Sequence, residues 1–235
     1  MKNVVALFIA SGLALLGTSC TEKEELLETC SSSCTTVTGR LVTANGSAPI
    51  AGATVTLKWH YGQGMNLGSK AKTRTTTDAN GKYQVSFYIN DNELAEGFFS
   101  VKYDVDKSRY YTIGEPGVAF PHLKRDTLVT VPNYIIPRKA FVRLAVTNPQ
   151  QIPSGGVFMS DFNTCYGTNN TFGPSIQGGG AVVNWQNLPS ENPLPVAGDQ
   201  PIIIRSYKTQ NGVTTQSSDT LAIPAVTTKT YTATY

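Results

Sequence analysis

Hydrophobic and polar residues alternate along most of the chain after residue 35, which is the pattern of half-buried β-strands. In the segment 53–59, apolar residues occupy the odd positions, and threonine and lysine occupy the even ones. Further strands are expected at 35–43, 72–77, 83–87, 99–105, 127–136, 139–146, 157–162, 181–185, 201–207, 213–216, 220–223 and 230–235. The only helix expected is a single turn near residues 92–96. The pattern therefore predicts an all-β protein.

Turn residues divide these strands into two groups. Asp78-Ala79-Asn80-Gly81 and Gln210-Asn211-Gly212 are typical hairpin turns, and Ile136-Pro137-Arg138 is a short linker. We expect two tandem antiparallel β-sandwiches, one over residues 36–135 and an immunoglobulin-like one over 138–235. Trp59 and Trp185 are each expected to be the core aromatic of one sandwich.

The first nineteen residues have the features of a signal peptide. Lys2 precedes an apolar run over residues 4–16, whose helical length of roughly 20 Å is shorter than a hydrocarbon core of about 30 Å. The following segment, Leu16-Gly17-Thr18-Ser19-Cys20, resembles the lipobox of bacterial lipoproteins, with its leucine one residue farther from the cysteine than usual. That departure resembles lipoproteins of the Bacteroidota. The resemblance implies a lipidated Cys20, acyl chains such as palmitate, and attachment to the outer membrane.

Residues 20–35 are expected to form an acidic tether. Glu22, Glu24, Glu25 and Glu28 outnumber Lys23, and such a segment stays solvated. It also resembles the acidic tag that sends some Bacteroidota lipoproteins to the cell surface. A plain tether and an export signal both remain open, so the protein is expected at the cell surface or on the periplasmic face.

A second resemblance covers residues 36–133. Val37-x-Gly39-x-Leu41, then Ala48-Pro49-Ile50-x-Gly52-Ala53-x-Val55-x-Leu57, then Thr77-Asp78-Ala79-Asn80-Gly81-Lys82-Tyr83 resemble the carboxypeptidase regulatory-like domain. The resemblance implies a transthyretin-like β-sandwich and no peptidase activity, since neither histidine begins a His-x-x-Glu motif. Related collagen-adhesin repeats form a Lys–Asn isopeptide bond. Arg40 stands where their lysine would be, so that bond is not expected.

Charge and cysteine content bear on which partners and metal sites are expected. The net charge of +3 is small and scattered, so no nucleic-acid partner is expected. Export permits disulfides, and Cys30 and Cys34 can bridge only if the segment turns; free thiols are the open alternative, for these two residues and for Cys165. No cysteine or histidine grouping has zinc-site spacing, so no metal site is expected.

The sequence contains few residues or motifs that are typical of catalytic sites. The chain has two histidines, His60 and His122, and lacks the common nucleophile, phosphate-loop and dinucleotide motifs. No catalytic residue and no cofactor is therefore predicted. Tyr61, Tyr111 and Tyr166 are the candidates for a binding rim, because exposed rings can stack on sugars. Thr127 and Thr220 follow aspartate and precede leucine, which resembles an O-glycosylation site of some Bacteroidota.

Three functions were weighed from these observations. The first is a non-enzymatic, lipid-anchored envelope protein whose sandwiches present loops such as 61–70 and 165–180 to a protein or glycan partner. The alternative is a structural or assembly subunit of an envelope or pilus complex that uses edge strands for β-augmentation. A small hydrolase is the third and least favoured.

Overall fold

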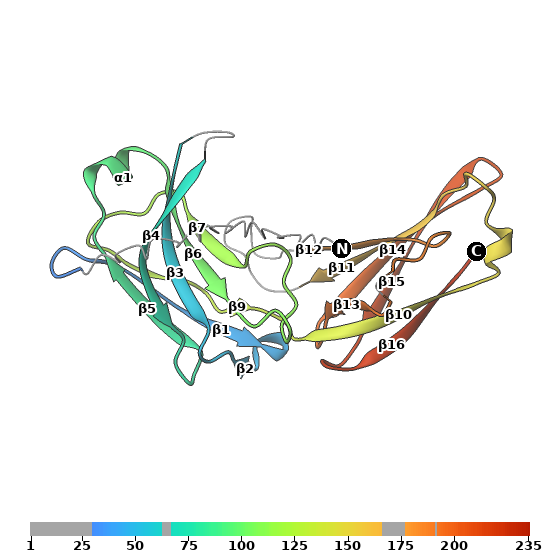
Figure 1. Cartoon of the computed structure of the whole chain (residues 1–235), viewed down its shortest axis with the longest axis horizontal. Coiled ribbons are helices and arrows are strands. Elements are labelled where there is room, and N and C mark those ends of the chain that lie inside the picture. Colours follow the sequence, from blue (N-terminus) through green and yellow to red (C-terminus); the bar gives the residue numbers. More distant parts are fainter. Residues whose placement is uncertain (1–29, 63–66, 166–176, 191) are drawn as a thin grey trace, which may run out of the picture.

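In the computed structural model, residues 30–62, 67–165, 177–190 and 192–235 are described. They form two β-sandwiches that lie one after the other along the long axis of the molecule (Figure 1). Each sandwich has its own hydrophobic core, one built from residues between Val37 and Ile136 and the other from residues between Ala140 and Ala233. The predicted all-β architecture of two tandem sandwiches is confirmed.

The first sandwich packs a five-stranded sheet against a four-stranded sheet. The five-stranded sheet contains β1 (Thr35–Thr43), β2 (Ala48–Pro49), β5 (Lys82–Phe87), β8 (Leu128–Thr130) and β9 (Tyr134–Ile135). The four-stranded sheet contains β3 (Thr54–Tyr61), β4 (Gly68–Thr76), β6 (Phe98–Asp104) and β7 (Gly117–Phe120). The short helix α1 (Asp91–Ala95) connects β5 to β6, where one helical turn is predicted.

Alternation along the strands sets the first core. Val37 and Leu41 of β1 are fully buried, whereas Thr38 and Arg40 between them face away from the core. Opposite them, Val55 and Leu57 on β3 and Val101 on β6 are also buried. Each pair of facing strands thus contributes its apolar positions to the interior, as the period of two requires.

Gly39 lies on β1 between the buried Val37 and Leu41, beside Tyr83, its cross-strand partner on β5. A side chain at Gly39 would overlap the Tyr83 ring. The absence of a side chain at this position therefore makes room for the ring to lie over β1. The Tyr83 hydroxyl then reaches the Tyr103 hydroxyl at 2.7 Å. Burial raises the pKa of Tyr83 to about 12, although its hydrogen bond with Tyr103 acts in the opposite direction.

The second sandwich packs a three-stranded sheet against a four-stranded sheet. The first contains β13 (Leu194–Ala197), β10 (Lys139–Thr147) and β16 (Thr228–Thr234). The second contains β12 (Gln177–Asn184), β11 (Phe158–Cys165), β14 (Pro201–Gln210) and β15 (Val213–Ala222), in that order. A 3₁₀ turn at Pro149–Gln151 lies between β10 and β11.

Trp185 fills the second core, as predicted. Its side chain is buried among the rings of Phe158, Phe162 and Tyr231. The indole Nε1 donates to the Ser160 hydroxyl at 2.8 Å, which satisfies the one polar group of the ring. Trp59 differs from the prediction: it is only half-buried at the margin of the first core, and its Nε1 donates to the Glu96 carbonyl at 3.0 Å.

The first strand of each sandwich pairs in parallel with the last. β1 pairs in parallel with β8 and β9, and β10 pairs in parallel with β16, while the other strand pairs are antiparallel. A parallel pair needs a long connection between its strands, and here the rest of each sandwich is that connection. The repetition of this arrangement shows that the two sandwiches share a topological feature.

Two segments were predicted with the wrong number of strands. The single strand expected at 127–136 is split into β8 and β9, because Pro132 between them has no N–H to donate to a ladder. The two strands expected at 213–216 and 220–223 form one continuous strand, β15. The residues between them are polar and were therefore predicted to form a loop. Both faces of this strand are exposed to solvent, so polar residues can continue the strand. Strands β2, β7 and β13 were not predicted.

Candidate functional site

Tyr61, the first predicted rim residue, ends β3 and is 40% exposed. Its ring packs against Trp59 with the ring centroids 4.7 Å apart, and it also covers Gly68, where a side chain would overlap the ring. One face of Tyr61 is therefore occupied by its own sandwich. Its role as a rim residue stays a prediction.

The described residues include two of the three rim candidates, Tyr61 and Tyr111. Tyr111, a candidate because exposed rings can stack on sugars, is half-buried and belongs to no named strand. The Tyr111 amide donates to the Pro137 carbonyl at 2.8 Å, which ties it to the junction between the sandwiches. Tyr166, like Cys20 and the acidic part of the tether, lies outside the described residues.

The remaining predicted modification sites differ in their surroundings. Cys30 and Cys34 are joined by a disulfide just before β1. The Thr127 hydroxyl donates to the Lys124 carbonyl at 2.7 Å, and Thr220 is exposed on β15. Glycosylation of either threonine stays a prediction, as does the state of Cys165, whose side chain is not described.

His60 is engaged with its own sheet. Its Nε2 lies 2.7 Å from the Ser100 hydroxyl, and its ring stacks on Phe98 with centroids 4.6 Å apart. Burial, followed by the charge of Lys58, lowers the pKa of His60, while Glu115 opposes the shift. His122 is exposed. Across the described ranges, no three histidine, cysteine, aspartate or glutamate side chains come close enough to hold a metal ion.

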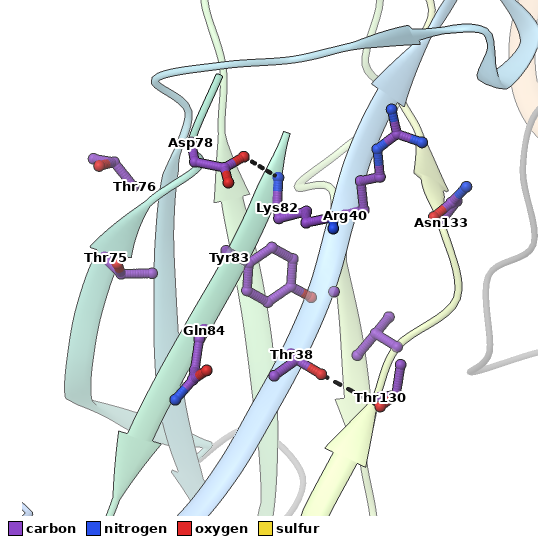
Figure 2. Close-up of a pocket in the computed structure, with 12 residues that line it drawn as sticks. Thr38, Arg40, Thr75, Thr76, Asp78, Lys82, Tyr83, Gln84, Thr130 and Asn133 are labelled. Carbon is purple, nitrogen blue, oxygen red and sulfur yellow. Dashed lines mark hydrogen bonds between the residues drawn. The ribbon is translucent and has the colours of Figure 1, made fainter. Parts of the chain in front are cut away.

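A shallow hollow of about 610 Å³ lies over the outer face of the first sandwich (Figure 2). We call it the β1 groove. The residues that line it come mainly from β1, β5 and β8, with Thr75 and Thr76 of β4 beyond the β5 edge. Register brings the polar ones into rows: Arg40 is opposite Lys82, and Thr38 lies between Gln84 and Thr130. These side chains share a face because the alternate residues of the same strands fill the core.

Two cations stand at one end of the β1 groove. The Arg40 Nε donates to the Asn80 carbonyl at 2.8 Å, and no other guanidinium atom has a hydrogen bond to a described residue. Asp78 is nearby, and its Oδ1 accepts the amides of Asn80 and Lys82, both at 2.8 Å, which builds the turn between β4 and β5. The groove thus has one end with two cations and one carboxylate, which leaves a net positive charge there, and the rest of its lining is uncharged.

The second feature is the free edge formed by β15. Nine of its ten residues are exposed, and only Leu221 is buried. Among the described strands it pairs only with β14, through an uninterrupted register from Pro201↔Ala222 to Gln210↔Val213. Asn211 and Gly212 close the hairpin with φ of 52° and 77°, the positive values that a type I′ turn requires.

Hairpin geometry shows which groups of β15 are free. In a two-residue hairpin the closing pair, here Gln210 and Val213, exchanges hydrogen bonds, and bonded and non-bonded pairs then alternate. The N–H and C=O groups of Thr214, Gln216, Ser218 and Thr220 therefore point away from β14. Consistent with this, the Thr220 N–H donates to the Asp219 carboxylate at 2.7 Å and not to β14.

β15 is the longest edge strand in the described parts of the chain, and it lacks the usual protection. Proteins block edges with lysine, proline, bulges or short strands. Here β4 has Lys70, Arg74 and a register shift in its pairing, β13 has Pro195, and β16 has Lys229. β15 contains no lysine, arginine or proline, and its pairing with β14 has no register shift. Apart from the Thr220 N–H, which the Asp219 carboxylate binds, its outward polar groups are available to another strand.

Sequence reasoning missed both features. The β1 groove could have been found from Arg40 and Lys82, since the predicted strands and the turn at 78–81 place them on outward positions. Arg40 was considered only as the residue that replaces a lysine. The free edge could not have been found in the same way, because strand order within a sheet is not readable from alternation.

No protein-family model and no curated protein matches the chain. The resemblance of residues 36–133 to the carboxypeptidase regulatory-like domain thus stays a prediction. Apart from the parts without a described placement, no helix is long and apolar enough to cross a membrane.

Solved structures show a weak likeness. The Bacillus anthracis TIE protein is 15% identical with a TM-score of 0.33, and the match covers 86% of this chain and 33% of that one. The Streptococcal ancillary pilin is 14% identical with a TM-score of 0.32, covering 87% and 63% of the two chains. The shaft pilin SpaA from Lactobacillus rhamnosus GG is 8% identical with a TM-score of 0.30, covering 86% and 97%. The chain spans about a third of the first of these proteins, and such scores do not establish a shared function.

Proposed function

We propose that this protein is a non-enzymatic structural subunit of a cell-envelope assembly, joined to a neighbouring subunit by β-augmentation along β15. The single observation that carries the proposal is the long, exposed and unprotected edge of that strand. An extended strand of a partner subunit would pair with the outward groups of Thr214, Gln216 and Ser218 and extend the four-stranded sheet.

The two-sandwich architecture fits a structural role. Main-chain contacts tie the junction: the Tyr111 amide donates to Pro137, and the Lys139 amide donates to the Arg109 carbonyl at 2.8 Å. Backbone hydrogen bonds on both sides of the linker restrict hinge motion, so a partner held at β15 would be held in a defined direction from the first sandwich. Relative domain motion is the default for tandem domains, so these main-chain contacts at the junction suit a load-carrying or spacing subunit.

The attachment to the envelope is part of the proposal and rests on the sequence. We propose that the chain is anchored to the outer membrane through lipidated Cys20, with the acidic segment as a tether. Lipid anchoring places the subunit at the base or along the surface of an assembly. The sequence also favours a protein or glycan site on the loops. A glycan site is argued below for a different surface, the β1 groove.

The test uses Ser218, whose N–H points to the free edge. Ser218→Pro removes that donor without removing a hydrogen bond to β14, and Ser218→Ala is the matched control. Complexes released by mild detergent from cells that express each variant are resolved on native gels. The wild-type chain and Ser218→Ala should migrate in one complex of fixed stoichiometry, and Ser218→Pro should migrate as the monomer. A wild-type chain that is monomeric in cells, or a Ser218→Pro complex of unchanged size, contradicts the proposal.

A further inference from the structure

We infer that the β1 groove binds an acidic oligosaccharide, with Arg40 and Lys82 holding the carboxylate of one sugar unit and the neutral polar side chains holding its neighbours. This site is separate from the β15 edge. It lies on the first sandwich, and its occupancy does not depend on whether β15 pairs with another strand.

The cation pair is the first argument. Arg40 and Lys82 are directly opposite each other on β1 and β5, and both face outward. Like charges in this position destabilise a sheet unless something compensates them. Neither side chain has an ion pair with a described residue, and the nearby Asp78 carboxylate, which accepts two main-chain amides on Oδ1, supplies one negative charge against the two cations. An anion bound between the two cations would remove the repulsion.

The hydrogen bond of Arg40 indicates which kind of anion the two cations would bind. Its Nε is held by the Asn80 carbonyl, so the plane of the guanidinium is fixed and its two terminal nitrogens remain to donate. A planar carboxylate accepts two parallel hydrogen bonds from such a group. Lys82 adds a point charge on the other side. The pair therefore fits a carboxylate at the cationic end.

The rest of the groove argues for a saccharide over a free anion. A small anion would occupy only the cationic end of a hollow of about 610 Å³. The other lining side chains include Thr38, Gln84 and Thr130 farther along the strands and Asn133 near Arg40 (Figure 2), which carry hydroxyls and amides that both donate and accept. Figure 2 shows Thr38 and Thr130 joined by a hydrogen bond, which is 3.3 Å long. Sugar hydroxyls, which also donate and accept, match such a surface.

The probe for the test is trigalacturonate, and binding to the full chain is measured by calorimetry. Its fully methyl-esterified form is the matched neutral probe, and sulfate alone tests for a free-anion site. We expect trigalacturonate to bind, and the ester and sulfate each to bind at least about tenfold more weakly. Arg40→Gln and Lys82→Gln should each weaken the binding of trigalacturonate by at least about tenfold, the effect of one lost charge-assisted interaction. Lys229→Gln on β16 changes the charge equally and should have no effect.

Four results would overturn the inference. They are no binding of trigalacturonate at millimolar concentration, equal binding of its ester, equal binding of sulfate alone, and equal weakening by Lys229→Gln. Circular dichroism of each variant confirms that it is folded. Because Ser218→Pro leaves the first sandwich untouched, that variant should bind trigalacturonate like the wild type, which separates this test from that of the assembly.

Discussion

The ammonium of Lys72 and the carboxylate of Glu93 form a buried ion pair in the first sandwich. The Lys72 Nζ lies 2.8 Å from Oε1 and 3.0 Å from Oε2 of Glu93, and the two side chains are 0% and 3% exposed. Oε2 also accepts the Asn90 amide at 2.8 Å, which caps the first turn of α1. One glutamate thus neutralises a buried lysine on β4 and fixes the connection between β5 and β6.

Removing one partner of this pair should destabilise the first sandwich strongly. Lys72→Met leaves a buried carboxylate without its cation and should lower the free energy of unfolding by about 3–5 kcal/mol. Urea unfolding, followed by circular dichroism, measures the change. Lys102→Met breaks an exposed pair with Glu115 and should cost less than about 1 kcal/mol. Equal losses in the two variants would show that burial does not govern the Lys72–Glu93 pair.

His60 should make the fold less stable in mild acid. Its pKa in the folded chain is lowered by burial below the ordinary 6.5, so the unfolded chain binds a proton first as the pH falls. Stability is therefore present above pH 6.5 and is lost as the pH falls below it. The melting temperature of the wild type should fall more between pH 8 and pH 5 than that of His60→Gln. Parallel curves for the two proteins would rule out this contribution.

The two buried tyrosines should make the fold sensitive to alkali. The pKa of Tyr83 is raised to about 12, and burial raises that of Tyr103 well above 10. The unfolded chain loses these protons near pH 10, so stability is lost as the pH rises above 10. Phenolate absorbance of the folded protein should show both groups titrating late. Tyr83→Phe leaves the Tyr103 hydroxyl without its partner and should cost about 1–3 kcal/mol in urea unfolding at pH 7.

Gly39→Ala should destabilise the first sandwich, because the new methyl group would overlap the Tyr83 ring. The expected loss is about 1–3 kcal/mol in urea unfolding, typical of overpacking a core. The double variant Gly39→Ala with Tyr83→Leu removes the ring. It should therefore lose less than the sum of the two single variants. Strict additivity would mean that the two positions are not coupled.

Much of this fold was predictable because alternation is a local property. The bounds of β1 were predicted residue for residue, and the hairpin turns at 78–81 and 211–212 lie where Asp-Ala-Asn-Gly and Asn-Gly predict them. Turn residues work through their own backbone preferences, so they need no tertiary context. Trp185 was likewise identified as a core residue from its type and its strand.

The features that depend on partners distant in sequence were not predictable. Nothing in the segment 213–222 says that it lies at an edge, and its polar middle predicted a break between two strands. Lys72 was placed on a strand and Glu93 on a helical turn, but their pairing needs the packing of α1 against β4. The groove is an intermediate case, because the strands and the turn that place Arg40 and Lys82 facing outward were predicted, whereas the pairing of β8 with β1, which completes the lining, was not. Both candidate sites in this protein depend on strand order and register.

Amide hydrogen exchange along β15 tests the central claim most directly. In the isolated chain, the amides of Gln216 and Ser218, which point to the free edge, should exchange rapidly, while those of Thr215 and Ser217, which face β14, are protected. In the complex recovered from cells, Gln216 and Ser218 should become as protected as their neighbours. Unchanged rapid exchange of Gln216 and Ser218 in that complex would show that the subunit is joined at some other surface.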